Sequence, residues 1–221
     1  MPVTLADAQA QITPIYNFQL NALYGGQAAN WVMPWGTEVA PAVTNFVDTG
    51  VASGGNNAFL DGFDIPDPDP NAAPGSTILV TGVALSDGLL NNMDIPALQF
   101  AIGHELGHAN HDVVDGPAHF NVGQPAPGHV PEVIADLVAA YSMRIVNGDW
   151  VNVGNAMANW QTTKIFGPNG DPDHNGVAIG HPPAATRVNC VNLLIQADPQ
   201  TWPAFVAAGR AILVPANVRF Q

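Results

Sequence analysis

The chain of 221 residues contains one cysteine and only five lysines and arginines. Because Cys190 has no partner in the chain, no internal disulfide can staple the fold. The five basic residues stand against 18 Asp and Glu, which gives a formal net charge of -13. Such a surface repels phosphate backbones and anionic lipid. The composition therefore argues against nucleic-acid and membrane-surface binding and favours a neutral or cationic partner.

The sequence also shows no recognisable targeting segment or membrane-spanning segment. The first 20 residues contain no basic residue and no uninterrupted apolar run of the length that a signal peptide needs. No later segment reaches the roughly 18 to 20 apolar residues of a membrane span. We therefore expect a soluble protein, and its compartment stays open.

Hydrophobic residues make up 47% of the chain, which is enough to fill one core. The sequence shows no internal repeat and no linker composition, so we expect a single domain over 1–221. Apolar spacing and caps predict mostly helices with short strands. We expect a mainly helical α+β fold with a small antiparallel sheet above the central helix. The Pro-rich stretch 62–76 is predicted as a loop. Helices are expected at 4–23, 94–111, 131–147, 149–164, 183–197 and 201–211, and strands at 39–47 and 77–83.

The stretch HELGH at 104–108 lies on the helix predicted from Asp94. Residues four apart project from the same helix face, so His104 and His108 can offer ring nitrogens to one zinc ion. Glu105 lies beside them, where a carboxylate can accept a proton from an attacking water. The alternative is a chance pattern on an ordinary core helix, because only three of the five positions are fixed.

A catalytic zinc needs a third protein ligand, and the segment PEVIAD supplies a candidate. Glu132 falls in the first turn of the next strong helix, and Asp136 follows one turn later on the same face. One carboxylate can bind the ion while the other accepts the free N–H of a ligand histidine. The alternative is a solvated pair of acids at a helix N-terminus, where the helix dipole favours them.

The segment GHPPAATR at 180–187 adds a histidine on a loop and an arginine on the following helix. His181 can hydrogen-bond a developing oxyanion, and Arg187 can hold an acidic partner in place. The alternative for both is an ordinary surface position.

Taken in order, these elements resemble the gluzincin family of HExxH zinc metallopeptidases that contains the type 1 CAAX prenyl protease and the bacterial heat-shock membrane endopeptidase. The resemblance spans about 57–190. The segments that carry it are NAF at 57–59, TILVTGVAL at 77–85, LLNNMDIPALQFAIGHELGH at 89–108, EVIAD at 132–136 and HPPAATR at 181–187.

The resemblance implies a zinc metalloendopeptidase with one zinc per chain. A peptide or protein substrate would lie extended along the strand at 77–83, held by edge pairing. Members of the family often carry membrane helices or a lipoprotein leader, and this chain shows neither. The implied roles are zinc ligation by His104, His108 and Glu132, general base for Glu105, orientation of His104 by Asp136, and an oxyanion or gating role for His181.

Two other readings stay open for the chain as a whole. It could be a zinc-bearing module that binds peptides without cutting them, or a structural protein with a vestigial zinc site. The Pro- and Gly-rich stretches at 62–76 and 112–129 flank the expected cleft as a lid or as solvated decoration.

Several further residues have weaker signals. A half calcium loop at Asp171, Asp173 and Asn175 has Pro182 where a bidentate glutamate belongs, so an Asx-turn loop is favoured over Ca²⁺ binding. Cys190 is predicted to be a small buried hydrophobe rather than a nucleophile. Core packing is favoured for Trp31 and Trp35, and no particular role for His111, His119, His129 and His174.

Overall fold

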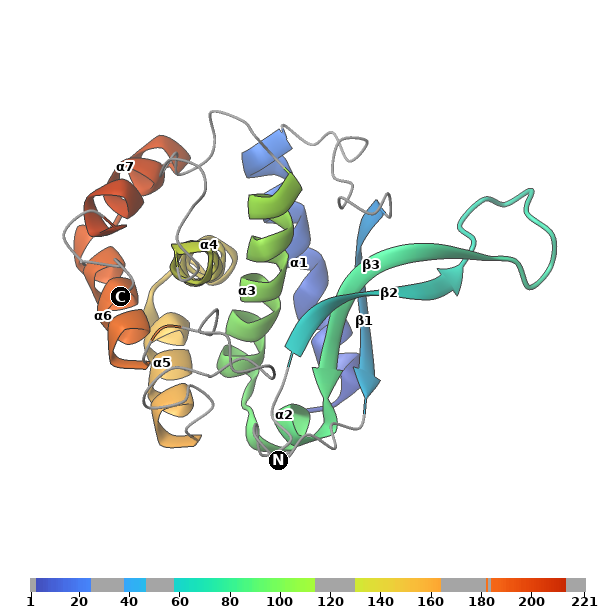
Figure 1. Cartoon of the computed structure of the whole chain (residues 1–221), viewed down its shortest axis with the longest axis horizontal. Helices are drawn as coiled ribbons and strands as arrows, with labels where there is room; N and C mark the ends of the chain where they lie inside the picture. The colour runs from blue at the N-terminus through green and yellow to red at the C-terminus, as the bar shows by residue number, and fades with distance from the viewer. Residues whose placement is uncertain are drawn as a thin grey trace.

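The computed structural model describes residues 3–24, 38–46, 58–113, 130–163, 182 and 184–213. It is a mainly helical α+β fold with one small sheet, as expected (Figure 1). The elements are α1 (Leu5–Tyr24), β1 (Glu38–Phe46), β2 (Ala58–Pro66), β3 (Thr77–Ser86), α2 (Asp87–Asn92), α3 (Ile95–Val113), α4 (Val130–Asn147), α5 (Val151–Thr163), α6 (Ala184–Ala197) and α7 (Trp202–Leu213).

Local signals account for the helix boundaries. Thr4 and Asp7 form a reciprocal cap, with the Thr4 N–H donating to the Asp7 carboxylate and the Asp7 N–H donating to the Thr4 hydroxyl. Asp94 accepts the Ala97 N–H at 2.9 Å and starts α3. Gly148 follows the last residue of α4 with a φ of 83°, a conformation that glycine adopts without strain. Pro14 lies inside α1, which starts at Leu5.

The sheet has three strands in the order β1-β3-β2, and it is mixed rather than antiparallel. β2 and β3 form an antiparallel hairpin, whereas β1 joins the other side of β3 in parallel. The expectation that the strand at 77–83 offers a free edge to substrate is therefore wrong from Val80 onward, because β3 is the central strand. Only Thr77–Leu79 extend beyond the pairing with β1.

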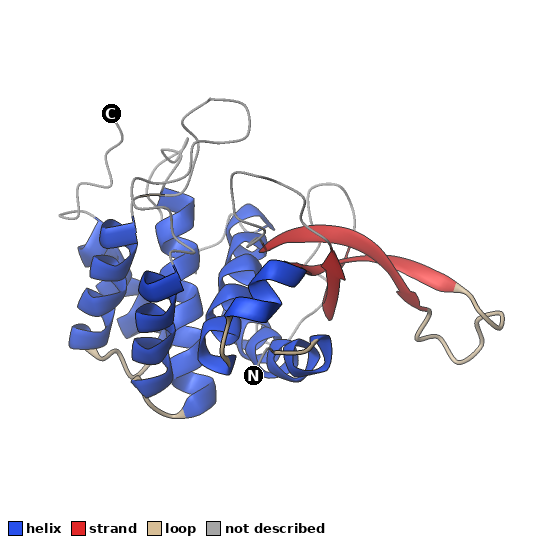
Figure 2. Cartoon of the chain, turned by 90° about the horizontal axis from the view of Figure 1, so that it is seen from below, coloured by secondary structure: helices blue, strands red, loops and turns tan. Residues whose placement is uncertain are grey.

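The predicted loop at 62–76 is shorter than expected. β2 continues through Pro66, which pairs with Thr77, so only 67–76 form the turn. Proline is tolerated there because it ends the strand and needs no further ladder bond. We call residues 61–79 the arm, because this part of the hairpin projects away from the helices (Figures 1 and 2).

α3 is the central element of the body and packs against α1, α4 and α5, with β2 and β3 alongside it (Figure 1). Its apolar side chains Leu98, Ile102 and Leu106 have no exposed surface. The sheet covers one side of the helical layer (Figure 2). Within the described ranges, no helix is both long enough and apolar enough to cross a bilayer.

Candidate metal centre

The site lies where α3 and α4 approach each other closely. A Cβ atom built on Gly107 would lie 3.0 Å from the Ala135 Cα, and one built on Gly103 would lie 3.1 Å from the Ala139 Cα. Glycines four apart on α3 thus face alanines four apart on α4. Any larger side chain at these positions would push the helices apart, so the small residues set the spacing between the histidines of α3 and the carboxylates of α4.

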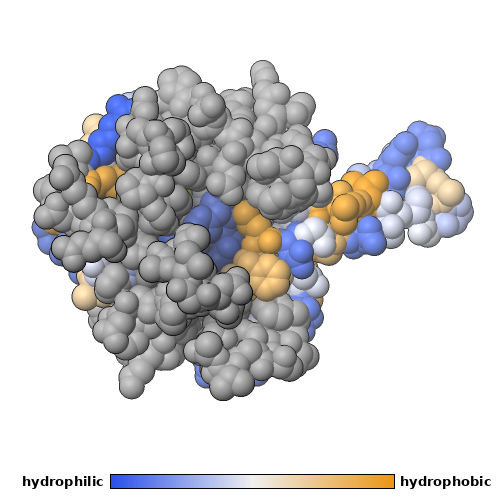
Figure 3. Space-filling model, in the orientation of Figure 1, coloured by the Kyte–Doolittle hydropathy of each residue, from blue (hydrophilic) through white to orange (hydrophobic). Residues whose placement is uncertain are grey.

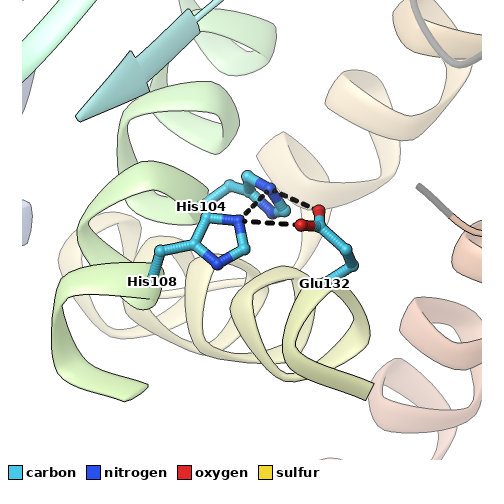
Figure 4. A group of neighbouring side chains, drawn as sticks. All are labelled: His104, His108 and Glu132. Carbon is cyan, nitrogen blue, oxygen red and sulfur yellow. Dashed lines mark hydrogen bonds and ion pairs between the residues drawn. The ribbon is translucent and has the colours of Figure 1, made fainter. Parts of the chain in front are cut away.

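Three side chains converge across this interface: His104 and His108 from α3 and Glu132 from α4 (Figure 4). The His104 Nε2 lies 3.2 Å from one Glu132 carboxylate oxygen, and the His108 Nε2 lies 3.4 Å from the other. The two Nε2 atoms are 3.0 Å apart. Two of the residues are one turn apart on one helix, as the sequence indicated, and the third comes from the first turn of the next.

These separations fit a zinc ion. Four tetrahedral ligands at the roughly 2.0–2.2 Å typical of zinc lie about 3.3 Å from one another. Two imidazole nitrogens and one carboxylate oxygen are also the donor set of catalytic zinc sites that leave a fourth position open. The described part of the chain therefore contains a cluster that could hold a metal ion, built from the predicted residues.

A buried ion pair supports the first histidine. Arg187 of α6 donates from Nε and Nη2 to the two carboxylate oxygens of Asp136, at 2.7 and 2.6 Å. The His104 Nδ1 lies 2.9 Å from the same carboxylate. The Nδ1 proton needs an acceptor. The Asp136 carboxylate is one, whereas the Arg187 guanidinium can only donate, so we assign this proton to a bond with Asp136. Once the ring is neutral, as metal binding requires, the lone pair of His104 lies on Nε2 and faces His108 and Glu132.

The charges of the cluster shift the pKa values of its members. Burial alone would lower the pKa of His104, but hydrogen bonds to Asp136 and Glu132 outweigh it and raise the pKa to about 9. Burial would likewise raise the pKa of Glu132, yet hydrogen bonds from His104 and His108 hold it far below the ordinary value. Without a metal the two carboxylates thus retain a proton on the histidine, and a bound cation would take over its charge.

Asp136 and Arg187 are both nine-tenths or more buried, at 0% and 2% exposure. Burial raises the pKa of Asp136, but the Arg187 guanidinium and the hydrogen bonds hold it below its usual value. The pair therefore stays charged inside the body. The alternative of a solvated acid at a helix N-terminus does not describe Asp136, nor does a surface position describe Arg187.

Other predicted residues fall elsewhere. Glu105 follows His104 on α3 and is 9% exposed. His181 and the half calcium loop at Asp171, Asp173 and Asn175 lie outside the described residues, as do Trp31, Trp35, His119, His129 and His174, and the side chain of His111. Cys190 is buried, and burial raises its pKa to about 11, which agrees with an inert core thiol.

One supporting contact was not predicted. Gln19 of α1 is fully buried and donates from its amide to the Gly103 carbonyl and to the Ser142 hydroxyl, both at 3.1 Å. Ser142 in turn donates to the Val138 carbonyl at 2.6 Å. This polar contact joins α1, α3 and α4 behind the cluster. The signal was present in the sequence, because Gln19 falls three and four residues after the buried Tyr16 and Ile15.

The helix-borne histidines, the glutamate of the next helix and the α+β frame are features of a metallopeptidase site. In agreement, residues 46–115 match the family model of peptidase family M48. That match supports a metallopeptidase family, whose members typically use zinc. It covers β2, β3, α2 and α3 but ends before Glu132, so the third candidate ligand rests on the sequence pattern and on the structure rather than on the match. No curated protein and no solved structure matches the chain.

Proposed function

We propose that this protein is a zinc-dependent endopeptidase that hydrolyses peptide bonds. The observation that carries the proposal is the cluster of His104, His108 and Glu132, whose ligand atoms all lie within 4.8 Å of one another. The family match over the preceding strands and the HELGH helix supports it. Since a glutamate follows the first histidine, a proton acceptor accompanies the ligand set.

Zinc bound to these three residues would lower the pKa of water toward 7 and polarise the scissile carbonyl. Glu105 would accept the proton of the attacking water and pass it to the leaving amine nitrogen. Asp136 would hold His104 in the tautomer that offers Nε2, and Arg187 would keep the Asp136 carboxylate ionised and fixed. The role predicted for His181, a hydrogen bond to the oxyanion, is part of the same proposal.

For substrate binding, we propose that the peptide pairs with β2 instead of β3. β2 is an edge strand among the described strands, and it lies alongside α3, which bears the two histidines. An extended peptide paired with β2 would cross α3. Main-chain pairing of this kind favours unfolded or extended segments of protein over compact ones.

The decisive experiment compares the zinc-loaded native protein with Glu105→Gln on a pool of unfolded polypeptides. The proposal expects cleavage by the native protein and a rate lower by about a thousandfold or more in the variant. Zinc content must remain equal in both, because Glu105 is not a ligand. Equal cleavage would show that Glu105 is not the base.

If neither protein cuts any polypeptide while both bind zinc, peptide hydrolysis is the wrong function. A zinc-bearing binding module or structural protein would then replace it.

A further inference from the structure

The arm extends beyond the part of the sheet that three strands build. The pairing of β1 with β3 begins at Val80, so the preceding residues Thr77–Leu79 pair with β2 on one side only. On the other side no strand of the described residues accompanies them. A strand end with one unmatched edge is a template for pairing with another extended chain.

An aliphatic side chain lies at this edge. Along β3 the alternate residues Leu85, Val83 and Thr81 have 0% exposure, and Leu79 continues the same row with 60% exposure. The change occurs because the arm leaves the helices that cover the rest of the row. On the opposite face Ile65 pairs with Ile78, and both are half-buried. Figure 3 shows hydrophobic side chains on the arm between the body and a hydrophilic tip.

The exposed leucine lies over a glycine of the neighbouring strand. The Leu79 Cδ1 is 3.6 Å from the position that a Cβ on Gly62 would occupy. Because Gly62 has no side chain, Leu79 packs directly on the β2 backbone, and its outer side stays exposed. Leu79 and Gly62 thus form a small apolar patch on the surface of the arm.

The surroundings of this patch are acidic. Asp64 lies directly opposite Leu79 in the hairpin and is exposed. Asp61 precedes it on the same strand, and Asp67 and Asp69 organise the turn by accepting backbone N–H bonds at 2.9 Å. The sequence contains no Lys, Arg or His from 58 to 103. An apolar patch with carboxylates around it is complementary to a segment that carries both aliphatic and basic side chains.

We propose that the arm binds an extended segment of a partner protein that carries aliphatic and basic side chains on the same face. The segment adds a strand at Thr77–Leu79, packs an aliphatic side chain against Leu79 and, two residues along on the same face, directs a lysine or arginine toward Asp64. This binding surface lies outside the metal cluster and requires no turnover, so it goes beyond peptide hydrolysis.

Charge decides between this occupant and two others. A second copy would bring another acidic arm, and an anionic bilayer would bring negative headgroups, so like charges would oppose both. A basic, extended polypeptide gains from the same field that repels them.

The test uses the full chain with Glu105→Gln, so that the probe is not cut. A fluorescent nine-residue peptide of repeated Val-Val-Lys-Lys, which places both kinds of side chain on each face of a strand, is titrated by anisotropy beside the same peptide with glutamate in place of lysine. We expect saturable binding of the basic peptide only. Leu79→Asp, added to this protein, should weaken it about tenfold or more, and Asp61→Asn with Asp64→Asn should weaken it and reduce its salt dependence. Val151→Asp is the matched control, since Val151 is 64% exposed on α5, and it should leave the affinity unchanged.

Four results would overturn the proposal. They are no binding of the basic peptide, equal binding of the acidic one, equal loss in the Val151→Asp control, and full affinity in Leu79→Asp with an unchanged melting temperature. Vesicles of anionic lipid and sedimentation of the protein alone serve as parallel arms. Uptake by vesicles or dimerisation that Leu79→Asp abolishes would assign the arm to a membrane or to a second copy instead.

Discussion

The interface between α3 and α4 and the arm are built on opposite principles. At the interface, glycines and alanines bring two helices to the limit of contact, and a buried arginine and carboxylates surround a histidine. On the arm, two strands leave the body and expose a leucine to solvent. Buried charge is stable only when every partner is in place, whereas an exposed strand tolerates change. Substitutions should therefore act strongly at the first region and weakly at the second.

The largest effect is expected for Asp136→Asn. This change leaves the guanidinium of Arg187 buried with a neutral partner, which should lower the free energy of unfolding by about 3–5 kcal/mol. Chemical denaturation measures the difference. The matched control is Asp198→Asn, because Asp198 pairs with Arg144 at the surface at 3.9 Å and should cost less than about 1 kcal/mol. Similar costs for both would mean that the pair is not buried in solution.

The next largest effect on stability is expected for one of two leucines on the same strand. Leu85 and Leu79 both belong to β3 and point to the same face, but one is in the core and the other on the arm. Leu85→Ala should destabilise the fold by about 2–5 kcal/mol, and Leu79→Ala by less than about 0.5 kcal/mol. Thermal melts of the pair measure this contrast. If Leu79→Ala were as costly as Leu85→Ala, the arm would be packed against something in solution.

Helix spacing is tested by Gly107→Ala. The added Cβ would meet the Ala135 backbone at 3.0 Å, so the helices must separate by a few tenths of an ångström. We expect about 1–3 kcal/mol of destabilisation and weaker zinc binding, measured by calorimetric titration. Gly154→Ala on α5 is the control, because nothing lies within 4 Å of its added Cβ, and it should stabilise the helix by up to about 1 kcal/mol. Unchanged zinc affinity in Gly107→Ala would mean that the spacing of α3 and α4 does not set the positions of the metal ligands.

The stability of the metal-free protein should also depend on pH. The folded state raises the pKa of His104 from 6.5 to about 9. Its contribution to stability is therefore complete below pH 6.5 and is lost as the pH rises to about 9. Melting temperatures should fall through this window after chelation. In zinc-loaded protein the ligand ring is already neutral, so this contribution should vanish, and an identical slope in both forms would contradict the protonated cluster.

Much of the candidate metal centre was predictable because its signals are local. HELGH and EVIAD place side chains one turn apart on helices, and caps such as Asp94 mark where those helices begin. Nothing in the helical period fixes how closely two helices approach. That information lay in Gly103, Gly107, Ala135 and Ala139, whose significance depends on which helix faces which.

The sheet was less predictable for the same reason. Alternation of side chains identified the strand at 77–83, but strand order follows from pairings between distant segments. β1 lies parallel to β3, although the two are separated by β2 in sequence. Proline content concealed the second half of β2, since Pro66 at the end of a strand resembles the prolines of the turn that follows. The roles predicted for His181 and the half calcium loop remain predictions.

The most direct test is the zinc content of the native protein, purified without chelator, beside Glu132→Ala and the control Glu38→Ala, whose glutamate is exposed. A three-ligand site predicts about one zinc per chain in the native protein and in Glu38→Ala, and a loss of most of it in Glu132→Ala. Well-folded native protein without zinc, or full zinc content in Glu132→Ala, would contradict the assignment of the α3–α4 cluster as the metal centre.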